Sequence, residues 1–278
     1  MVCSHFLLNE TNRVVHYSWI MSASAFSLHG KVAVVIGGTS GIGLALSLGL
    51  AEAGADVIAS SRGETAVEKT AKQIEALGRK TLRTTADVGQ RASLEKVRDA
   101  VIATFGKVDV LVNCAGITGK GPTLNFSEES WREILDTNLN GTLRACQVFG
   151  EHMLSRKSGR IINIASLSTY LGLFEVAAYG ASKAGVGSLT KTLAVEWSRH
   201  GVLVNAILPG VFRTPLNASL LDETARGREF LARTPMGRFG EVRELVGAAV
   251  FLASEAASFV TGSLLVVDGG ILASGVNL

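Results

Sequence analysis

Short apolar runs alternate with helix-patterned segments from Lys31 almost to the end of the chain, and this alternation constrains the fold more than any other feature. The runs read KVAVVIGG, DVIASS, VDVLVNCAG, GRIINIAS, VLVNAILPG and GSLLVVDGG, and we expect a further strand just before TADVGQ. Strands that are apolar on both sides, with helices between them, are typical of a parallel sheet covered on both faces. No linker, low-complexity tract or internal repeat interrupts the pattern. We therefore predict a single doubly wound α/β domain with a parallel seven-stranded sheet and helices on both faces.

The composition supports one large domain and argues against several kinds of partner. Of the 278 residues 47% are hydrophobic, so a core can form without disulfides or metals. The formal net charge is only +3, which gives no electrostatic reason to expect nucleic acid or a membrane surface as a partner. No apolar run reaches the roughly 18 residues of a membrane span. Cys3, Cys114 and Cys146 form no disulfide or metal-ligand pattern, so we expect no metal and a reducing, cytoplasmic setting.

The first 29 residues differ in character from the rest of the chain. They contain no apolar stretch long enough for a signal peptide, and they lack the Arg-rich, Ser-rich pattern of a transit peptide. Met21 precedes SAFSLHGK, which leads directly into the first strand, so we interpret Met21 as the point where translation starts. We expect residues 1–29 to be a mobile N-terminal extension and residues 30–278 to form the functional domain.

A glycine-rich turn, GGTSGIG, follows the first strand and opens the next helix. In open parallel sheets, ligands bind beyond the carboxyl ends of the strands. Backbone N–H groups and the helix dipole at such a turn favour a pyrophosphate, and a tight turn with close helix–strand packing is the competing interpretation. The candidate cofactor-binding residues of this turn are Gly37, Thr39, Ser40, Gly41, Ile42 and Gly43.

The second strand ends in SSRGE, where an NAD site usually places an acidic residue against the adenosine ribose. Ser61 and Arg62 stand there instead, and a guanidinium beside a hydroxyl suits a 2′-phosphate. We therefore favour NADP(H) as the cofactor, with NAD(H) as the alternative. Glu64 is the competing ribose ligand, but we place it in the first turn of the next helix, where an acid is favourable in any case. The alternative for Arg62 is a solvated loop charge.

Polar residues also follow the third and fourth strands. Asp87 and Val88 stand after the third strand, and Asn113, Ala115 and Gly116 stand after the fourth. Asp and Asn at strand ends are often only turn residues. In a nucleotide crevice they are placed to contact the adenine edge and to line its ribose, so we include all five as cofactor-binding candidates.

The stretch AAYGASKAG sets Tyr179 and Lys183 four residues apart among small residues. On a helix, residues i and i+4 share one face, with Cβ atoms about 5–6 Å apart. An ammonium group there favours a phenolate, and small neighbours let a large flat ligand approach. The competing interpretation is close helix packing around a buried aromatic and a surface lysine. Ser166, at the end of the preceding strand, is either a helix cap or a catalytic hydroxyl.

In the order and spacing of these motifs, residues 30–272 resemble the short-chain dehydrogenase/reductase family. The resemblance rests on the glycine loop, Ser166, Tyr179 and Lys183, together with NCAG, NLNG, NAILPG and VDGG in their family order. Each motif is loose, but their combined order and spacing are specific. The resemblance implies a Rossmann-type fold, an NAD(P)-dependent oxidoreductase acting on CH–OH groups, and a homotetramer.

The chain departs from the family pattern at three positions. Ile36 stands where a threonine is common, and Cys114 replaces the second asparagine of the usual NNAG. Many members that use NADP carry a basic residue in the glycine loop, where this chain has Ser40. The third departure leaves Arg62 as the main candidate for contact with the 2′-phosphate.

The resemblance also implies catalytic roles for four residues. Tyr179 is the general acid in reduction and the general base in oxidation. A free phenol has a pKa of about 10, so the pKa of Tyr179 must be lowered for this role. That lowering takes roughly 3–4 kcal/mol in favour of the phenolate. Lys183 and oxidised nicotinamide each supply a positive charge for this, and Lys183 also holds the nicotinamide ribose. Ser166 holds the substrate oxygen. Asn138 positions a water that links Lys183 to solvent.

After the sixth of these strands, the resemblance places Pro209, Gly210, Val211 and Thr214 against the nicotinamide. The segment near 212–239 then corresponds to a helical lid over the substrate, and lids exclude water. The lid is rich in arginine, and the competing interpretation of these arginines is a solvated helical face. The arginines concerned are Arg213, Arg226, Arg228 and Arg233.

The sequence identifies the type of reaction more closely than the substrate. SAFSLHGKVAVV and RTPMGRFGEVRELVGAAVFLAS are most similar to the sugar-acid branch of the family, so we favour a sugar acid or polyol and a gluconate 5-dehydrogenase-like activity. Reduction of 3-oxoacyl groups on an acyl carrier protein is the alternative, and the lid arginines suit either one. A non-catalytic cofactor-binding protein is the less favoured alternative, because all four catalytic residues are present and the fold alone does not establish chemistry.

Overall fold

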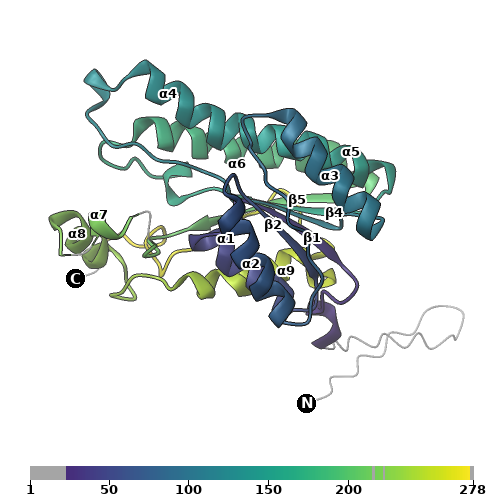
Figure 1. Ribbon diagram of the computed structural model, residues 1–278. Helices are drawn as coiled ribbons and strands as arrows, with labels where there is room; N and C mark the ends of the chain where they lie inside the picture. Colours follow the sequence, from purple (N-terminus) through teal and green to yellow (C-terminus); the bar gives the residue numbers. More distant parts are fainter. Residues whose placement is uncertain (1–22, 215–216, 222, 276–278) are drawn as a thin grey trace, which may run out of the picture.

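The structure, a computed structural model, describes residues 23–214, 217–221 and 223–275. Its centre is one parallel sheet with the strand order β2-β1-β3-β4-β5-β6 (Figure 1). The strands are β1 Val32–Ile36, β2 Asp56–Ser60, β3 Val110–Asn113, β4 Gly159–Ile164, β5 Val202–Pro209 and β6 Leu264–Val267. Because β1 pairs with both β2 and β3, the strand order reverses beside β1, and this reversal is where open parallel sheets bind their ligands.

The sheet has six strands among the described residues, so the prediction of seven is wrong by one. The missing strand is the segment before Asp87, which runs along the outer edge of β2. Only two backbone hydrogen bonds join it to that edge, from Val57 to the Lys80 carbonyl at 3.1 Å and from Ala86 to the Ser61 carbonyl at 3.0 Å. Between these two bonds, the hydroxyls of Ser60 and Thr84 share a hydrogen bond, and no continuous backbone ladder forms. The segment lies at the rim of the sheet, where water competes for its backbone groups.

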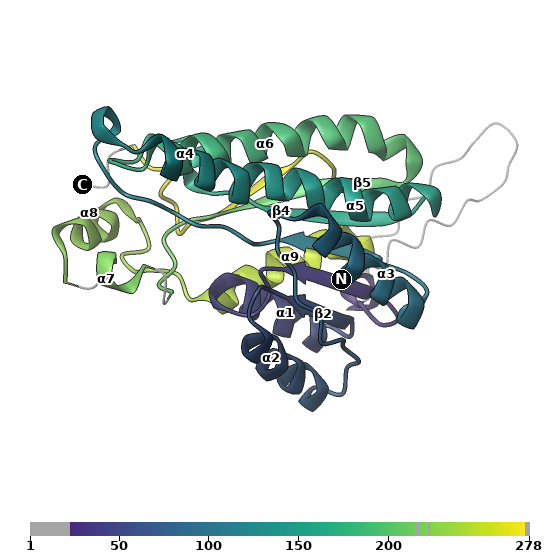
Figure 2. The same cartoon turned by 45° about the horizontal axis from the view of Figure 1, so that its top comes forward.

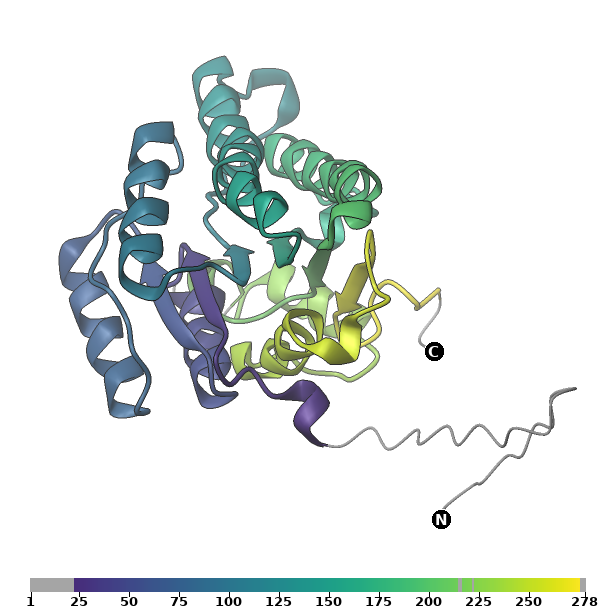
Figure 3. The same cartoon turned by 90° about the vertical axis from the view of Figure 1, so that its right-hand side faces the viewer.

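Helices cover both faces of the sheet, as the apolar strand pattern predicts (Figures 1 and 3). One face carries α1 Gly41–Glu52, α2 Glu64–Ala76 and α9 Val246–Ala253. The opposite face carries α3 Arg91–Phe105, α5 Gly141–Ser155 and α6 Ala177–Trp197. In β1, Ala33 and Val35 pack toward the first helix layer and Val32, Val34 and Ile36 toward the second, so every side chain of the strand is buried.

Two further parts of the fold lie around the carboxyl ends of the strands. Helix α4 Glu128–Leu135 continues into α5 through a π turn, Asp136–Asn140, and a π turn within a helix often marks a functional position. The short helices α7 Ala218–Leu221 and α8 Ala225–Arg233 project from the body on the opposite side of the same edge (Figure 2).

A chain of buried polar side chains fastens β3, β4 and α6 together below this edge. Asn113 Nδ2 donates to Asn163 Oδ1 at 2.9 Å, and Asn163 Nδ2 donates to Thr190 Oγ1 at 2.9 Å. Thr190 in turn donates to the Val186 carbonyl at 2.8 Å. Buried polar groups of this kind are costly when unpaired, so the chain fixes the relative position of the two strands and the helix.

The predicted N-terminal extension, with Met21, lies mostly outside the described residues; of it, the structure describes residues 23–29. Residues 30–278 are predicted to form a single domain, and all six strands of this region join one sheet. None of the helices within the described ranges combines the length and the apolar character needed to cross a membrane.

Candidate active site

A cavity of about 260 Å³ opens at the carboxyl edge of the sheet, between the glycine turn, the ends of β3, β4 and β5, and the start of α6. Predicted site residues that line it are Ser40, Gly41, Ile42, Gly43, Gly116, Ser166, Tyr179, Lys183, Pro209, Gly210 and Thr214. Residues that line it without having been predicted are Cys114, Ile117, Ile164, Ala165, Phe212 and Asn217. Most of these adjoin a predicted residue in sequence, so extending each motif by one or two positions identifies them.

The glycine turn has no room for a side chain at Gly37 or at Gly43. Gly37 has a φ of +80°, and a Cβ on it would lie 2.5 Å from the Ala115 backbone nitrogen. A Cβ on Gly43 would lie 2.0 Å from the Gly37 carbonyl oxygen. The Ser40 side chain makes no capping hydrogen bond to α1, so the first backbone N–H groups of that helix stay available at the cavity. This turn therefore presents a bare helix N-terminus that fits a pyrophosphate.

The end of β2 is linked to the glycine turn. Thr39 Oγ1 donates to Ser61 Oγ at 2.8 Å, which joins two of the predicted cofactor-binding residues. Arg62 is exposed beside them, and Glu64 begins α2, as predicted. Ser60 is fully buried and shares a hydrogen bond with Thr84, so it faces away from any ligand at this edge. The exposed cation with a hydroxyl at hand fits a 2′-phosphate.

Of the residues after the predicted third strand and after β3, Asp87, Val88 and Asn113 make contacts within the protein, and Gly116 lines the cavity. Asp87 folds over its own turn, because its carboxylate accepts the Gly89 N–H at 2.9 Å. Val88 packs against Gly141 at the start of α5. Asn113 directs its amide into the core, toward Asn163 and the Cys146 sulfur, so its side chain serves the buried polar chain rather than the cavity. Gly116 lines the cavity beside Lys183.

Tyr179 and Lys183 lie one turn apart in the first half of α6, as their spacing predicts. Lys183 Nζ lies 5.8 Å from the centroid of the Tyr179 ring and donates to the Ile164 carbonyl at the end of β4, at 2.7 Å. Ser166 follows that same strand and is only 8% exposed. Its hydroxyl accepts the Ser168 N–H at 3.2 Å, so it caps a short 3-10 helix and also borders the cavity. The structure thus shows the helix cap and places Ser166 at the cavity, and its catalytic role stays a prediction.

Asn138 lies in the π turn between α4 and α5 and is fully buried. Its side-chain oxygen accepts the Ile117 N–H at 2.8 Å, and its Nδ2 donates to the Ile117 carbonyl at 2.9 Å and to Ser182 Oγ at 3.0 Å. The side chain therefore joins the loop after β3 to the helix that carries Tyr179 and Lys183.

Burial dominates the proton affinities in the cavity. It lowers the pKa of Lys183 to about 8. It raises the pKa of Tyr179, and a hydrogen bond with Ser166 offsets that rise only in part. Burial also raises the pKa of Cys114 to about 11. The protein groups alone thus raise the pKa of Tyr179, because removal of the phenolate from water outweighs the favourable contacts. The predicted lowering depends also on the positive charge of oxidised nicotinamide and stays a prediction.

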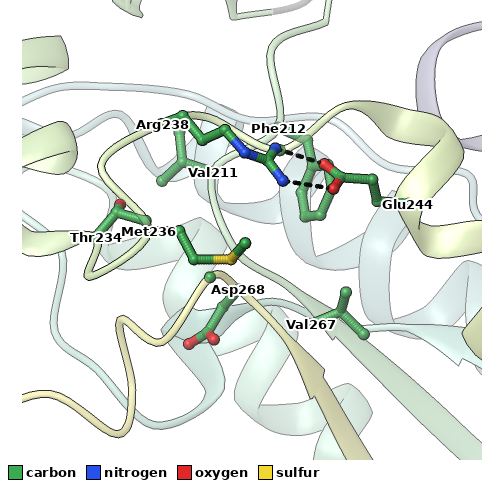
Figure 4. Close-up of a pocket in the computed structure, with 10 residues that line it drawn as sticks. Val211, Phe212, Thr234, Met236, Arg238, Glu244, Val267 and Asp268 are labelled. Atoms are coloured by element: carbon green, nitrogen blue, oxygen red, sulfur yellow. Dashed lines mark hydrogen bonds and ion pairs between the residues drawn. The ribbon is translucent and has the colours of Figure 1, made fainter.

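The predicted lid begins and ends at one point beside the cavity (Figure 4). Phe212 and Gly240 form an isolated bridge, and the Gly240 N–H donates to the Val211 carbonyl at 3.0 Å. Arg238 and Glu244 close this base with two hydrogen bonds of 2.8 and 2.7 Å. A hollow of about 90 Å³ lies between this base and the end of β6. The two ends of the predicted lid are therefore held together at one point.

Comparison with known proteins identifies a matching family and two similar dehydrogenases. Residues 36–272 match the family described as enoyl-(acyl carrier protein) reductase. The chain is 41% identical over 254 residues to 2-dehydro-3-deoxy-D-gluconate 5-dehydrogenase of Escherichia coli strain K12, which covers 91% of this chain and all of that protein. It is 39% identical over 249 residues to gluconate 5-dehydrogenase of Gluconobacter oxydans strain 621H, covering 90% and 97% of the two chains.

A solved structure has the same architecture. The gluconate 5-dehydrogenase of Burkholderia cenocepacia J2315, crystallised in complex with NADP and tartrate, superimposes with a TM-score of 0.88 at 38% identity. The match covers 91% of this chain and 99% of that one. The sheet, the glycine turn and the cavity therefore belong to an architecture that spans nearly the whole length of both proteins.

The packing of the glycine turn leads to a prediction for Gly43→Ala. The added Cβ would meet the Gly37 carbonyl, so the turn must shift and move the helix N-terminus. We expect NADPH to bind at least about tenfold more weakly, a change of about 1.4 kcal/mol, with a lower melting temperature. Fluorescence titration with NADPH and thermal unfolding measure both effects.

The matched control is Gly247→Ala, an exposed helical glycine whose added Cβ meets nothing within 4 Å. It should bind NADPH like the parent and keep or slightly raise stability, since alanine favours a helix by up to about 1 kcal/mol. Parental affinity in Gly43→Ala would show that the turn does not hold the cofactor.

Proposed function

The chain belongs to the short-chain dehydrogenase/reductase family and is an NAD(P)-dependent oxidoreductase acting on CH–OH groups; from this premise we propose that it interconverts a secondary alcohol and a ketone on a sugar acid, with NADP(H) as the favoured cofactor. The observation that carries the proposal is the meeting of Ser166, Tyr179 and Lys183 at one cavity. The sugar-acid substrate is supported by relatives of about 40% identity that are named for gluconate and its derivatives.

In this proposal Tyr179 exchanges the proton. It donates to the carbonyl oxygen during reduction and accepts the alcohol proton during oxidation. Ser166 lies next to it and holds the same oxygen by a hydrogen bond. Lys183 is charged below its pKa of about 8, so at neutral pH it places a cation near the phenol. The three side chains orient the substrate and manage one proton, and bound nicotinamide supplies the hydride.

The residues present fit NADP(H). The bare N-terminus of α1 suits the pyrophosphate, and exposed Arg62 with Ser61 suits the 2′-phosphate. Gly116 and Lys183 border the cavity where the nicotinamide ribose is expected. Pro209, the last residue of β5, lines the cavity with Gly210 and Thr214, and Val211 lines the neighbouring hollow. The presence of NADP in the crystal of the Burkholderia relative supports the same choice.

Asn138 has a positioning role in the proposal. Its side chain ties Ile117 to Ser182, so the backbone around the π turn is held next to Lys183. That arrangement suits a water path from Lys183 to solvent, which lets the proton on Tyr179 be replaced after each turnover. The segment 212–239, pinned at the Phe212–Gly240 bridge, acts as the substrate lid.

We extend the proposal to a homotetramer in the cytoplasm. Edge strand β6 is only partly buried, Val195 on α6 is 78% exposed and Phe259 is fully exposed, so apolar surface is available to further copies of the chain. The described cysteines, Cys114 and Cys146, are free thiols, which suits a reducing compartment.

A second activity, the reduction of 3-oxoacyl thioesters, is favoured by one observation, the carrier-protein description of the matching family. The first test therefore compares D-gluconate, 5-keto-D-gluconate, polyols and acetoacetyl thioesters with both cofactors. We expect turnover of sugar acids, and we expect Tyr179→Phe to lose about 10²–10⁴ of the rate while still binding NADPH, because the general acid is gone.

The control for this test is Tyr170→Phe, since Tyr170 is half-exposed outside the cavity lining. It should keep its rate within about threefold, or roughly 0.65 kcal/mol. Exclusive turnover of thioesters would replace the sugar-acid proposal, and a fully active Tyr179→Phe would remove the tyrosine from its role.

The pH dependence follows from the direction of the two pKa shifts. Alcohol oxidation needs the phenolate of Tyr179, whose pKa is raised by burial, so kcat/KM for oxidation should rise as pH increases into the alkaline range. Lys183→Met removes the cation that lies beside Tyr179 below a pH of about 8, so the rate at pH 7 should fall, whereas the rise at higher pH, where Lys183 is already neutral, should stay in place. Initial rates across pH 6–10 at constant ionic strength measure this.

Lys191→Met is the matched control, because Lys191 is on the same helix but exposed. It should leave the pH profile in place. An unchanged rate at pH 7 in Lys183→Met would mean that the charge of Lys183 does not act on Tyr179.

Cofactor preference provides a separate prediction. We expect kcat/KM to favour NADP(H) over NAD(H) by at least about tenfold, since a charge-assisted hydrogen bond contributes about 1.5–3 kcal/mol. Arg62→Ala should remove most of this preference by weakening NADP(H) with little effect on NAD(H). Arg79→Ala, at the far end of α2, should leave the ratio unchanged. A parent enzyme that prefers NAD(H) would mark Arg62 as a solvated loop charge.

A further inference from the structure

One arginine of the lid reaches across to the wall that carries the proposed catalytic groups. Arg226, on α8, donates from Nη1 to the Phe174 carbonyl at 3.1 Å. Phe174 stands in the loop between Ser166 and Tyr179. The guanidinium also lies over the Phe230 ring, 5.6 Å from its centroid. A carbonyl on one side and a ring beneath it hold the planar group in one orientation.

The loop that presents the Phe174 carbonyl is itself fixed. Glu175 has a φ of +60°, a left-handed conformation that is costly for a residue with a side chain. Its carbonyl accepts the Gly121 N–H at 2.9 Å, and its carboxylate pairs with Lys120 at 3.3 Å. The strained residue is thus held from two sides, and the carbonyl that Arg226 meets has a defined place five residues before Tyr179.

Arg226 is electrostatically misplaced for its own helix. It lies in the first turn of α8, where the positive end of the helix dipole disfavours a cation, and this turn contains no acidic residue. A residue that breaks a local rule without a local gain points to a function. Within residues 23–214, 217–221 and 223–275, its guanidinium has no carboxylate partner, and one of its five N–H donors is used on Phe174.

The neighbouring lid arginines are engaged with the lid itself. Arg228 donates to the Glu223 carbonyl at 2.9 Å. Arg233, which is 73% exposed, pairs with Glu229 one turn earlier on α8. These two contacts match the solvated helical face that was the competing interpretation of the lid arginines, whereas the contact of Arg226 with the catalytic wall does not.

We propose that Arg226 binds the carboxylate of the sugar-acid substrate and so determines its specificity, an inference that rests on the proposed function. The remaining N–H donors of a guanidinium already oriented by Phe174 and Phe230 can form a two-pronged pair with a carboxylate. The same contact joins α8 to the loop that precedes Tyr179. A neutral substrate of the same size cannot form this ion pair with Arg226.

The test compares D-gluconate with D-gluconamide, whose primary amide replaces the carboxylate, in the full-length enzyme with NADP. Arg226→Leu should raise KM for gluconate by about 10–150-fold, the range of one charge-assisted hydrogen bond. The kcat for gluconate and the KM for gluconamide should change by less than about threefold. Arg226→Gln keeps a donor for the Phe174 carbonyl but carries no charge, so it should behave like Arg226→Leu, and Arg226→Lys should recover part of the affinity.

Arg228→Leu is the matched control and should keep the parental KM for both compounds. Melting temperatures and NADPH affinities of all variants verify that the fold and the cofactor site are intact. The inference is overturned if Arg226→Leu leaves KM for gluconate unchanged, if both compounds lose equally, or if Arg226→Gln restores the parental value. Failure of the parent enzyme to turn over any sugar acid overturns the proposed function, and this inference with it; a parent active on gluconate and unaffected by Arg226→Leu overturns the inference alone.

Discussion

The geometry of the site depends on where one buried ammonium group is held. Lys183 donates to the Ile164 carbonyl at the last residue of β4, so this hydrogen bond fixes α6 against the mouth of that strand. Ser166 follows Ile164 by two residues and Tyr179 precedes Lys183 by one helical turn, so a single contact brings the serine and the tyrosine to the same cavity. Burial also lowers the pKa of Lys183 to about 8, so the charge of this lysine near neutral pH depends on the groups around it.

Support for this arrangement comes from below the cavity. The polar chain from Asn113 through Asn163 to Thr190 crosses β3, β4 and α6, and the side chain of Asn138 ties the loop after β3 to α6. Asn138 and Asn163 pair both ends of their amides inside the protein, where an unpaired amide is costly, whereas Asn113 pairs only its nitrogen. These contacts fix the floor and inner wall of the cavity, and on its other side the two ends of the predicted lid meet at Phe212 and Gly240.

The sequence predicted the fold class and the place of the site, and its errors have separate physical causes. The apolar runs identified six strands correctly because burial on both faces leaves a strong signal. The segment before Asp87 was predicted as a seventh strand, yet at the sheet edge its backbone groups compete with water and form only two bonds to β2. Asn113 is predicted to bind the cofactor, and the structure shows its side chain turned inward to Asn163, since a period-two pattern does not tell which neighbour an amide meets; the cofactor contact stays a prediction.

By itself, the sequence determined what depends on neighbouring residues along the chain. It determined the glycines that must lack a side chain, the helical spacing of Tyr179 and Lys183, the absence of an acid after β2, and the arginines of the lid. Only the tertiary structure decided which groups from distant segments meet. It placed the Ile164 carbonyl on Lys183, let burial raise rather than lower the pKa of Tyr179, and directed Arg226 toward Phe174 while Arg228 and Arg233 stayed with their own helices. The physical reason is that desolvation and directional hydrogen bonds depend on contacts between residues far apart in the chain, and local patterns do not encode those contacts.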